Sequence, residues 1–101
     1  MREPHNQLRR APWRTPAGGP VFFRTDDSDS MLSVLADNAE YALVRNASDM
    51  AAFSRTILGI EHSEPTEVHY LAERLTECLR DALLVAELRG ERLGMEPDED
   101  D

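Results

Sequence analysis

Apolar side chains recur at helical spacing along the last third of the chain, from Pro65 to Gly94. The recurring positions alternate steps of three and four residues: Val68, Leu71, Leu75, Cys78, Ala82 and Val85, widened by Ala72, Leu79, Leu83 and Ala86. A proline fits the first turn of a helix, because the N–H that it lacks has no helical partner there. The pattern predicts one long helix that starts at Pro65 and ends at Gly90 or Gly94.

A second apolar stripe with the same spacing runs from Met31 to Leu58. Its members are Leu32, Leu35, Ala39, Leu43, Ala47, Met50, Phe53 and Ile57. Asn46 and the pair Ser48-Asp49 resemble a helix end followed by a new cap, which would divide the segment into two helices. The stripe nevertheless keeps its phase through them, and neither Gly nor Pro intervenes. We favour one helix over two shorter ones, with a bend near Asn46 left open.

A short polar turn, residues 59–63, separates the two helical segments. Gly59 suits the left-handed conformation that often follows a helix, and Ser63 or Glu64 can cap the next helix. So short a connection makes neighbouring helices antiparallel. The predicted arms are equal, 29 residues each for 30–58 and 65–93. The expected fold is therefore all-α, an antiparallel hairpin of two long helices.

The second helix carries more apolar surface than one helix–helix seam can cover. Leu83, Leu84 and Val85 are consecutive, so they point around most of its circumference. The residues expected to need cover or a partner are Leu79, Leu83, Leu84 and Leu88. The cover could be the first helix folded into two pieces, a second copy of the chain, or another protein. We expect a homodimer or a helical protein partner that completes a bundle.

The two ends of the chain lack apolar periodicity. Residues 1–20 contain four of the six prolines and a Gly-Gly pair, and residues 95–101 carry five acids. Both segments are therefore expected to be disordered tails on a helical domain that spans residues 21–94. The apolar run 21–23 is too short for an independent strand, so we expect it to fold over the end of the helical core, with an exposed docking patch as the alternative.

The polar run 25–30 follows these apolar residues and precedes the first helix. It resembles the start of an oxygen-rich calcium loop but lacks the central glycine and the distal glutamate of such a loop. Helix capping is the better interpretation. The candidate capping residues are Asp27, Ser28 and Ser30.

The net charge of −9 is unevenly distributed. Residues 1–24 carry +4, residues 25–94 carry −8 and residues 95–101 carry −5. An acidic body argues against wrapping DNA. The arginine-rich N-terminal arm supports an alternative function in nucleic-acid binding, in which arginines grip phosphates and an aromatic ring stacks on a base. The residues of that alternative are Arg9, Arg10, Trp13 and Arg14.

The inventory of reactive side chains favours no enzyme. Cys78 lies in the apolar stripe, where a buried thiol is inert, and a single cysteine builds neither a disulfide nor a zinc site. His69, Glu73 and Glu77 share a helix face, but the other helix offers only Glu40, so the pattern of a dimetal bundle is absent. No glycine-rich phosphate loop is present. We expect no catalytic, cofactor-binding or metal-binding residues.

No apolar run has the length of a membrane span or the form of a secretion signal, so a cytoplasmic location without membrane association is expected. Taken together, the patterns favour a small helical protein–protein interaction or regulatory module without catalytic activity. The alternative is a nucleic-acid accessory protein that uses the N-terminal arginine arm. Binding to DNA or RNA that falls with added salt would distinguish the two.

Overall fold

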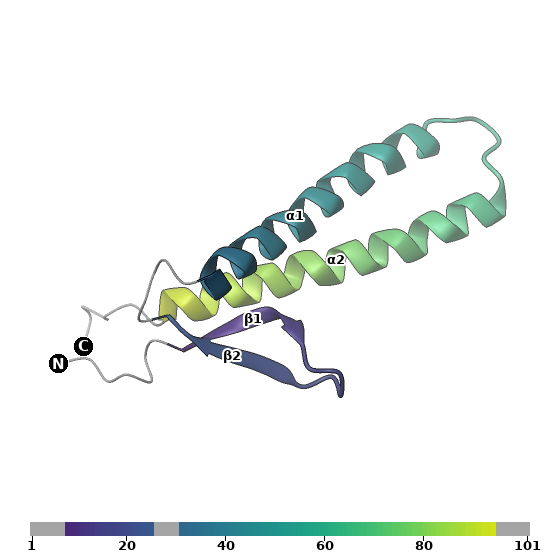
Figure 1. The fold of residues 1–101 in the computed structure, drawn as a ribbon. Coiled ribbons are helices and arrows are strands. Elements are labelled where there is room, and N and C mark those ends of the chain that lie inside the picture. Colours follow the sequence, from purple (N-terminus) through teal and green to yellow (C-terminus); the bar gives the residue numbers. More distant parts are fainter. Residues whose placement is uncertain (1–7, 26–30, 95–101) are drawn as a thin grey trace.

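The computed structural model describes residues 8–25 and 31–94. In order along the chain, its elements are β1 (Leu8–Arg14), β2 (Pro20–Arg24), α1 (Met31–Leu58) and α2 (Pro65–Gly94). Figure 1 shows α1 and α2 as an antiparallel pair, with the two strands packed near the start of α1 and the end of α2. The predicted helical hairpin is confirmed, and a two-stranded antiparallel sheet is added to it.

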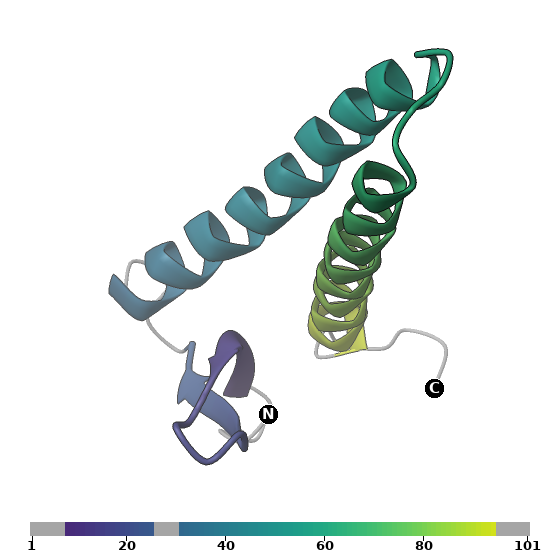
Figure 2. The same cartoon turned by 90° about the vertical axis from the view of Figure 1, so that its right-hand side faces the viewer.

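Each helix is one continuous element. α1 has 28 residues and passes through Asn46 without interruption, and α2 has 30 residues and begins at Pro65 as predicted. The two views in Figures 1 and 2 show that the helices cross at an angle instead of running parallel. The molecule is elongated, with principal extents of 63 × 35 × 22 Å. An elongated shape leaves a large fraction of the chain at the surface.

The two strands and the turn between them form an antiparallel β-hairpin, residues 8–24, which we call the ribbon. Arg9 pairs with Phe23 and Arg10 with Phe22, and the register shifts before Arg14 pairs with Pro20. Pro12 lies in this irregular stretch, where a residue without an N–H removes no ladder bond. Gly18 has a φ of 93° and closes the turn by donating its N–H to the Thr15 carbonyl at 2.8 Å.

The ribbon is held by its contact with the helices. An isolated two-stranded ribbon is marginally stable in water, so it needs an apolar surface to pack on. Ala11, Phe23 and Ala36 form a buried cluster between ribbon and α1, with Trp13 and Val21 packed against it. Figure 2 shows the ribbon below the start of α1 and beside the end of α2, where the crossing helices have separated.

The prediction of a disordered segment over residues 1–20 is therefore wrong for residues 8–20. The apolar residues 21–23 do fold back over the helical core, but they do so as part of strand β2. They form a strand because β1 supplies the hydrogen-bonding partner that the run lacks on its own. Residues 1–7 and 95–101, and the predicted capping run 26–30, lie outside the described residues.

The turn between the helices differs in part from the prediction. Glu64 does lie at the start of α2, where its carbonyl accepts from the Val68 N–H at 3.0 Å. His62, not Gly59, takes the left-handed conformation, with a φ of 67°. Gly59 still donates its N–H to the Arg55 carbonyl at 3.1 Å and so continues the last turn of α1. Ser63 donates its hydroxyl to the Ile57 carbonyl at 3.0 Å, so it caps the end of α1 instead of the start of α2.

Candidate interaction surface

Three consecutive residues of α2 meet three different environments, because successive helix residues point about 100° apart. Val85 is 2% exposed and faces the interior of the hairpin. Leu84 is half-buried, in a small hollow that it shares with residues of β1 and with Pro20. Leu83 is 60% exposed. The chain itself thus covers two of the three apolar directions around α2.

The exposed direction continues along the helix as one uncharged stripe, which we call the outer face of α2. It consists of Ala72, Thr76, Leu79, Leu83, Ala86, Gly90 and Leu93, at alternating steps of four and three residues. Every member is exposed, and Leu79 and Leu93 are 62% and 74% exposed. At 1.5 Å per residue the stripe is about 32 Å long. Soluble monomers rarely leave so continuous an apolar stripe in water.

Of the four leucines predicted to need cover or a partner, two are covered within the chain. Leu88 is almost completely buried, and Leu84 lies against the ribbon. Leu79 and Leu83 remain on the outer face. The ribbon, which covers Leu84, was not among the three possible neighbours that the sequence suggested. The sequence held little signal for β1, because residues 8–14 do not alternate between polar and apolar residues and include Pro12.

The buried face of α1 is shifted by one residue from the predicted stripe. The fully buried residues of α1 are Ser33, Ala36, Glu40 and Ser54. Leu32, Leu35 and Phe53 were predicted to lie in the stripe but are about half exposed. The shift follows from the ribbon and the glutamate, since Ala36 packs on Phe23 and Glu40 is drawn inward by arginines. The outward leucines add a second exposed apolar region near the start of α1.

Glu40 is the centre of a buried ionic cluster that joins three elements. Arg92 of α2 binds it with two hydrogen bonds of 2.8 Å, from Nη1 to Oε2 and from Nη2 to Oε1. Arg9 of β1 reaches Glu40 Oε2 at 3.3 Å and Asp37 Oδ1 at 2.8 Å. Two parallel bonds from one guanidinium are the strongest geometry available to a carboxylate. The cluster therefore fixes the ribbon and the end of α2 to α1.

The electrostatics of the cluster favour the charged form of Glu40. Burial acts to raise the pKa of this carboxyl, but the hydrogen bonds and positive charges of Arg92 and Arg9 outweigh burial and lower the pKa. The hydrogen bond to Glu40 correspondingly raises the pKa of Arg92. Arg9 also lies over the Phe23 ring, 5.7 Å from its centroid. Its Nε is buried without an acceptor.

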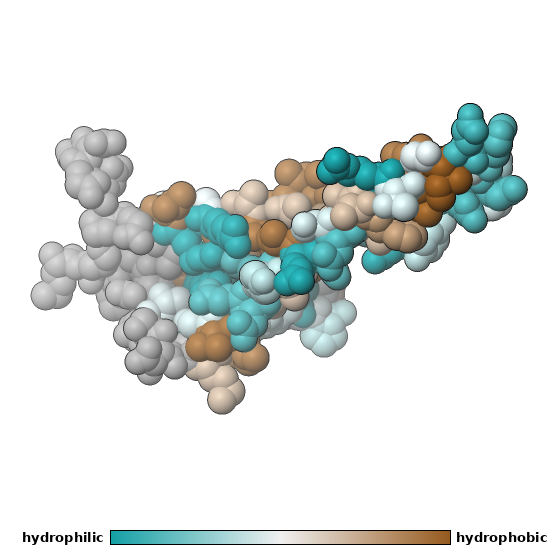
Figure 3. All heavy atoms as spheres, turned by 90° about the horizontal axis from the view of Figure 1, so that it is seen from above, coloured by the Kyte–Doolittle hydropathy of each residue, from teal (hydrophilic) through white to brown (hydrophobic). Residues whose placement is uncertain are grey.

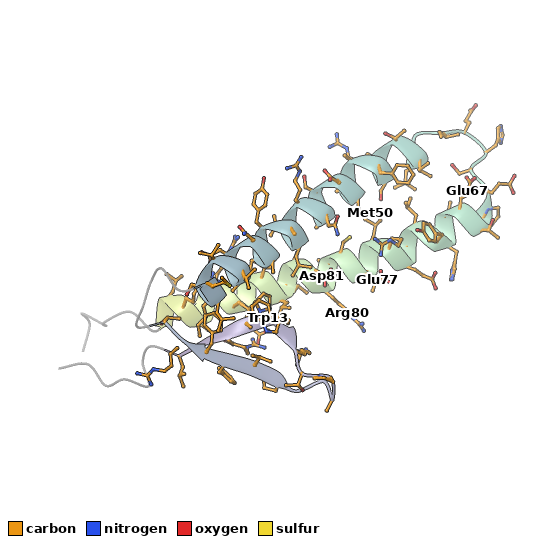
Figure 4. The ribbon with its side chains drawn as sticks, viewed as in Figure 1. Trp13, Met50, Glu67, Glu77, Arg80 and Asp81 are labelled. Carbon is orange, nitrogen blue, oxygen red and sulfur yellow. The ribbon has the colours of Figure 1, made fainter. Side chains whose placement is uncertain are left out.

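The residues proposed for a nucleic-acid arm mostly serve the fold. Arg9 is held in the Glu40 cluster, and Arg10 is paired with Glu87 at 2.9 Å and Glu91 at 2.7 Å. The hydrogen bonds that Arg10 donates to Glu91 raise the pKa of Arg10. Trp13 stacks on Phe23 with ring centroids 6.4 Å apart and lies between ribbon and α2 in Figure 4. Arg14 is exposed and donates to the Gly18 carbonyl at 3.2 Å.

The side chains considered for catalysis are placed apart. Cys78 is a free, buried thiol, as predicted. His69 Nε2 lies 3.5 Å from Glu73 Oε2 on the surface of α2, with both side chains exposed. Within residues 8–25 and 31–94, no three His, Cys, Asp or Glu side chains converge closely enough to hold a metal ion.

A hollow opens between the helices at the end where the turn joins them. Its volume is about 300 Å³, and its lining is Phe53, Ile57, Thr66, Glu67, Tyr70 and Leu71. Five of these six residues carry no charge. Figure 3, seen from above, shows apolar surface along the helix pair and near the turn. The hollow carries no group placed for chemistry.

In the described part of the chain, neither helix has an apolar stretch long enough to cross a membrane. Comparisons of the chain with models of protein families, with curated proteins and with solved structures gave no match.

Proposed function

We propose that this protein is a small helical interaction or regulatory module without catalytic activity, and that it acts by binding a protein surface through the outer face of α2. One observation carries the proposal. Leu79 and Leu83 are about three-fifths exposed in the middle of an uncharged stripe, while the neighbouring Leu84, Val85 and Leu88 are covered within the chain. A helix that is apolar all round is typically buried on all sides.

A partner helix suits this face better than a small molecule does. The stripe is a ridge of leucines separated by Ala and Gly, without the enclosed cavity and convergent polar groups that small ligands use. Amphipathic helices are recognised through anchors at steps of three and four residues, which is the spacing of the outer face. The expected partner is a second copy of the chain or another helical protein.

The alternative function in nucleic-acid binding has weaker support. Arg9 and Arg10 already neutralise carboxylates of the chain, so their release to bind phosphate would take a cationic partner from Glu40, Glu87 and Glu91. Of the four residues of the arm, Arg14 and the exposed part of Trp13 remain available to contact a nucleic acid. We expect no retention on DNA or RNA that depends on salt concentration.

The proposal is tested by a photo-crosslinking amino acid placed at position 83, compared with one at position 77, in the cells that make the protein. Leu83 lies on the outer face, whereas Glu77 lies on the same helix, is exposed, and pairs with Arg74. Position 83 should crosslink to a protein and position 77 should not. Absence of any protein crosslink at position 83 would refute the proposed function, and binding to DNA or RNA that falls with added salt would favour the alternative.

A further inference from the structure

We infer that the occupant of the outer face is the same face of a second copy of this chain, packed antiparallel. This inference rests on the proposed function and specifies its partner. It follows from two properties of the outer face: the order of its large and small residues, and the charges along its edge. Both match a copy that is turned by a two-fold axis between positions 82 and 83.

The order of side-chain sizes is self-complementary only in the antiparallel direction. A two-fold axis between positions 82 and 83 places Leu79 opposite Ala86 and Leu93 opposite Ala72. Thr76 comes opposite Gly90, within one residue. Leu79 and Leu93 then each meet a small side chain, which favours interdigitated packing. Leu83 lies beside the axis and packs against Leu83 of the second copy. A parallel pair would place Leu79 on Leu79 and Gly90 on Gly90, with clashes and gaps in alternation.

The charges at the edge of the outer face agree with the same arrangement. Arg80 and Glu87 are seven residues apart, so they lie two turns apart along one edge. The antiparallel axis places Arg80 of one chain opposite position 85 of the other, within two residues of Glu87, and symmetry makes this contact twice. Arg80 is exposed and points away from α1 in Figure 4. Glu87 contacts Arg10, but its side chain is 63% exposed and keeps acceptor capacity.

The resulting dimer would complete the surroundings of α2. In each chain α2 would be bordered by α1, by the ribbon and by the α2 of the second copy, so Val85, Leu84 and Leu83 would each have a neighbour. The net charge of −9 per chain opposes association. Added salt screens that repulsion between the two chains. The dimer should therefore tighten as salt is added, in contrast to a complex held mainly by attraction between opposite charges.

The register is tested with two single-cysteine variants, Ala72→Cys and Leu93→Cys, each in a Cys78→Ala background. The inferred dimer places position 72 of one chain opposite position 93 of the other, whereas two copies of position 72 would be about 32 Å apart. A short bismaleimide should therefore link a mixture of the two variants and leave each variant alone unlinked. Linkage within either variant alone, or no linkage in the mixture, would overturn the inference.

The charge contact is tested by mixing Arg80→Glu with Glu87→Arg. Each variant alone would bring like charges together twice, whereas the mixed dimer would restore two opposite-charge contacts. The ratio of mixed to unmixed dimers should exceed its statistical value by about threefold, given the modest energy of exposed ion pairs. Both variants retain the bonds of Arg10 to Glu91, and circular dichroism should confirm that each variant is folded. A statistical mixture would refute the antiparallel register.

The failure of this inference can be told from the failure of the proposed function. If light scattering shows a monomer at high concentration and high salt, and position 83 crosslinks to a different protein in cells, the second copy is the wrong occupant and the interaction function stands. If position 83 crosslinks to no protein, the function itself fails.

Discussion

Arg9 of β1 and Glu40 of α1 lie 31 residues apart in the chain and form a charged contact of 3.3 Å, with side chains only 6% and 3% exposed. Arg92, from the last turn of α2, completes the carboxylate's coordination. A buried charge that loses its partner is strongly destabilising, so each of these residues depends on the other two. The ribbon is for this reason an integral part of the helical domain.

Glu40→Gln should destabilise the protein by about 3 kcal/mol, because Arg9 and Arg92 would lose the charge that compensates their burial. The matched control is Asp37→Asn. Asp37 also binds Arg9, but its side chain is 65% exposed, so its removal should cost less than about 1 kcal/mol. Urea unfolding followed by circular dichroism measures both changes. Equal losses of unfolding free energy in the two variants would show that the buried Glu40 contributes no more to stability than the exposed Asp37.

Acid should weaken the protein through the same carboxyl. The folded pKa of Glu40 lies below its ordinary value of 4.5, so its stabilising contribution is fully present above pH 4.5. That contribution is lost as the pH falls through the lowered folded value, where the carboxyl becomes protonated in the folded chain. Midpoints of urea unfolding between pH 7 and pH 3 measure the loss.

The control for this titration is Glu40→Gln, which cannot lose a charge at this position. Its decline below pH 4.5 should be shallower than that of the natural protein, since only the remaining carboxylates contribute. Parallel curves would exclude Glu40 as a source of acid sensitivity.

The two long helices and their antiparallel order could be predicted because their stripes and their punctuation by Pro65 and the turn are local features. The ribbon could not be predicted in the same way. Each of its strands is too short to be stable alone, and the reason for its order lies in Phe23 packing on Ala36 and Arg9 binding Glu40. These contacts join residues 13 and 31 positions apart, which no short sequence window contains.

The buried face of α1 also depends on long-range contacts that a short sequence window does not contain. Hydrophobicity alone selected Leu32 and Leu35 as interior positions, whereas the structure buries Ala36 against the ribbon and Glu40 against two arginines. Likewise, the sequence showed that Leu83, Leu84 and Val85 needed three neighbours. It did not show which residues already had one, so Leu84 and Leu88 were grouped with the two leucines that remain exposed.

Leu84→Glu and Leu83→Glu should therefore have different effects, although the two residues are adjacent. The first places a charge against β1 and should lower stability by about 2 kcal/mol, since it removes a partly buried leucine from the ribbon contact. The second should leave the fold intact, because Leu83 is exposed. Unfolding monitored by Trp13 fluorescence measures the first effect, because Trp13 lines the same hollow as Leu84.

Light scattering measures the consequence for association. Leu83→Glu should abolish any dimer while helicity is retained, whereas loss of helicity in this variant would show that Leu83 has a neighbour within its own chain.

Removal of residues 1–20 should be strongly destabilising, although these residues are rich in proline and their sequence predicts a dispensable tail. The deletion removes β1, so Glu40 loses Arg9 and Phe23 loses its paired strand. Leu84 then loses the cover of β1, and the shortened protein should unfold at lower urea concentration and bind more of an apolar dye than the full chain. Deletion of residues 1–7 alone is the control and should leave the described contacts unchanged. A shortened protein lacking residues 1–20 that kept the full unfolding midpoint would show that β1 does not stabilise the helical domain. It would also show that the Arg9–Glu40 contact contributes nothing to stability.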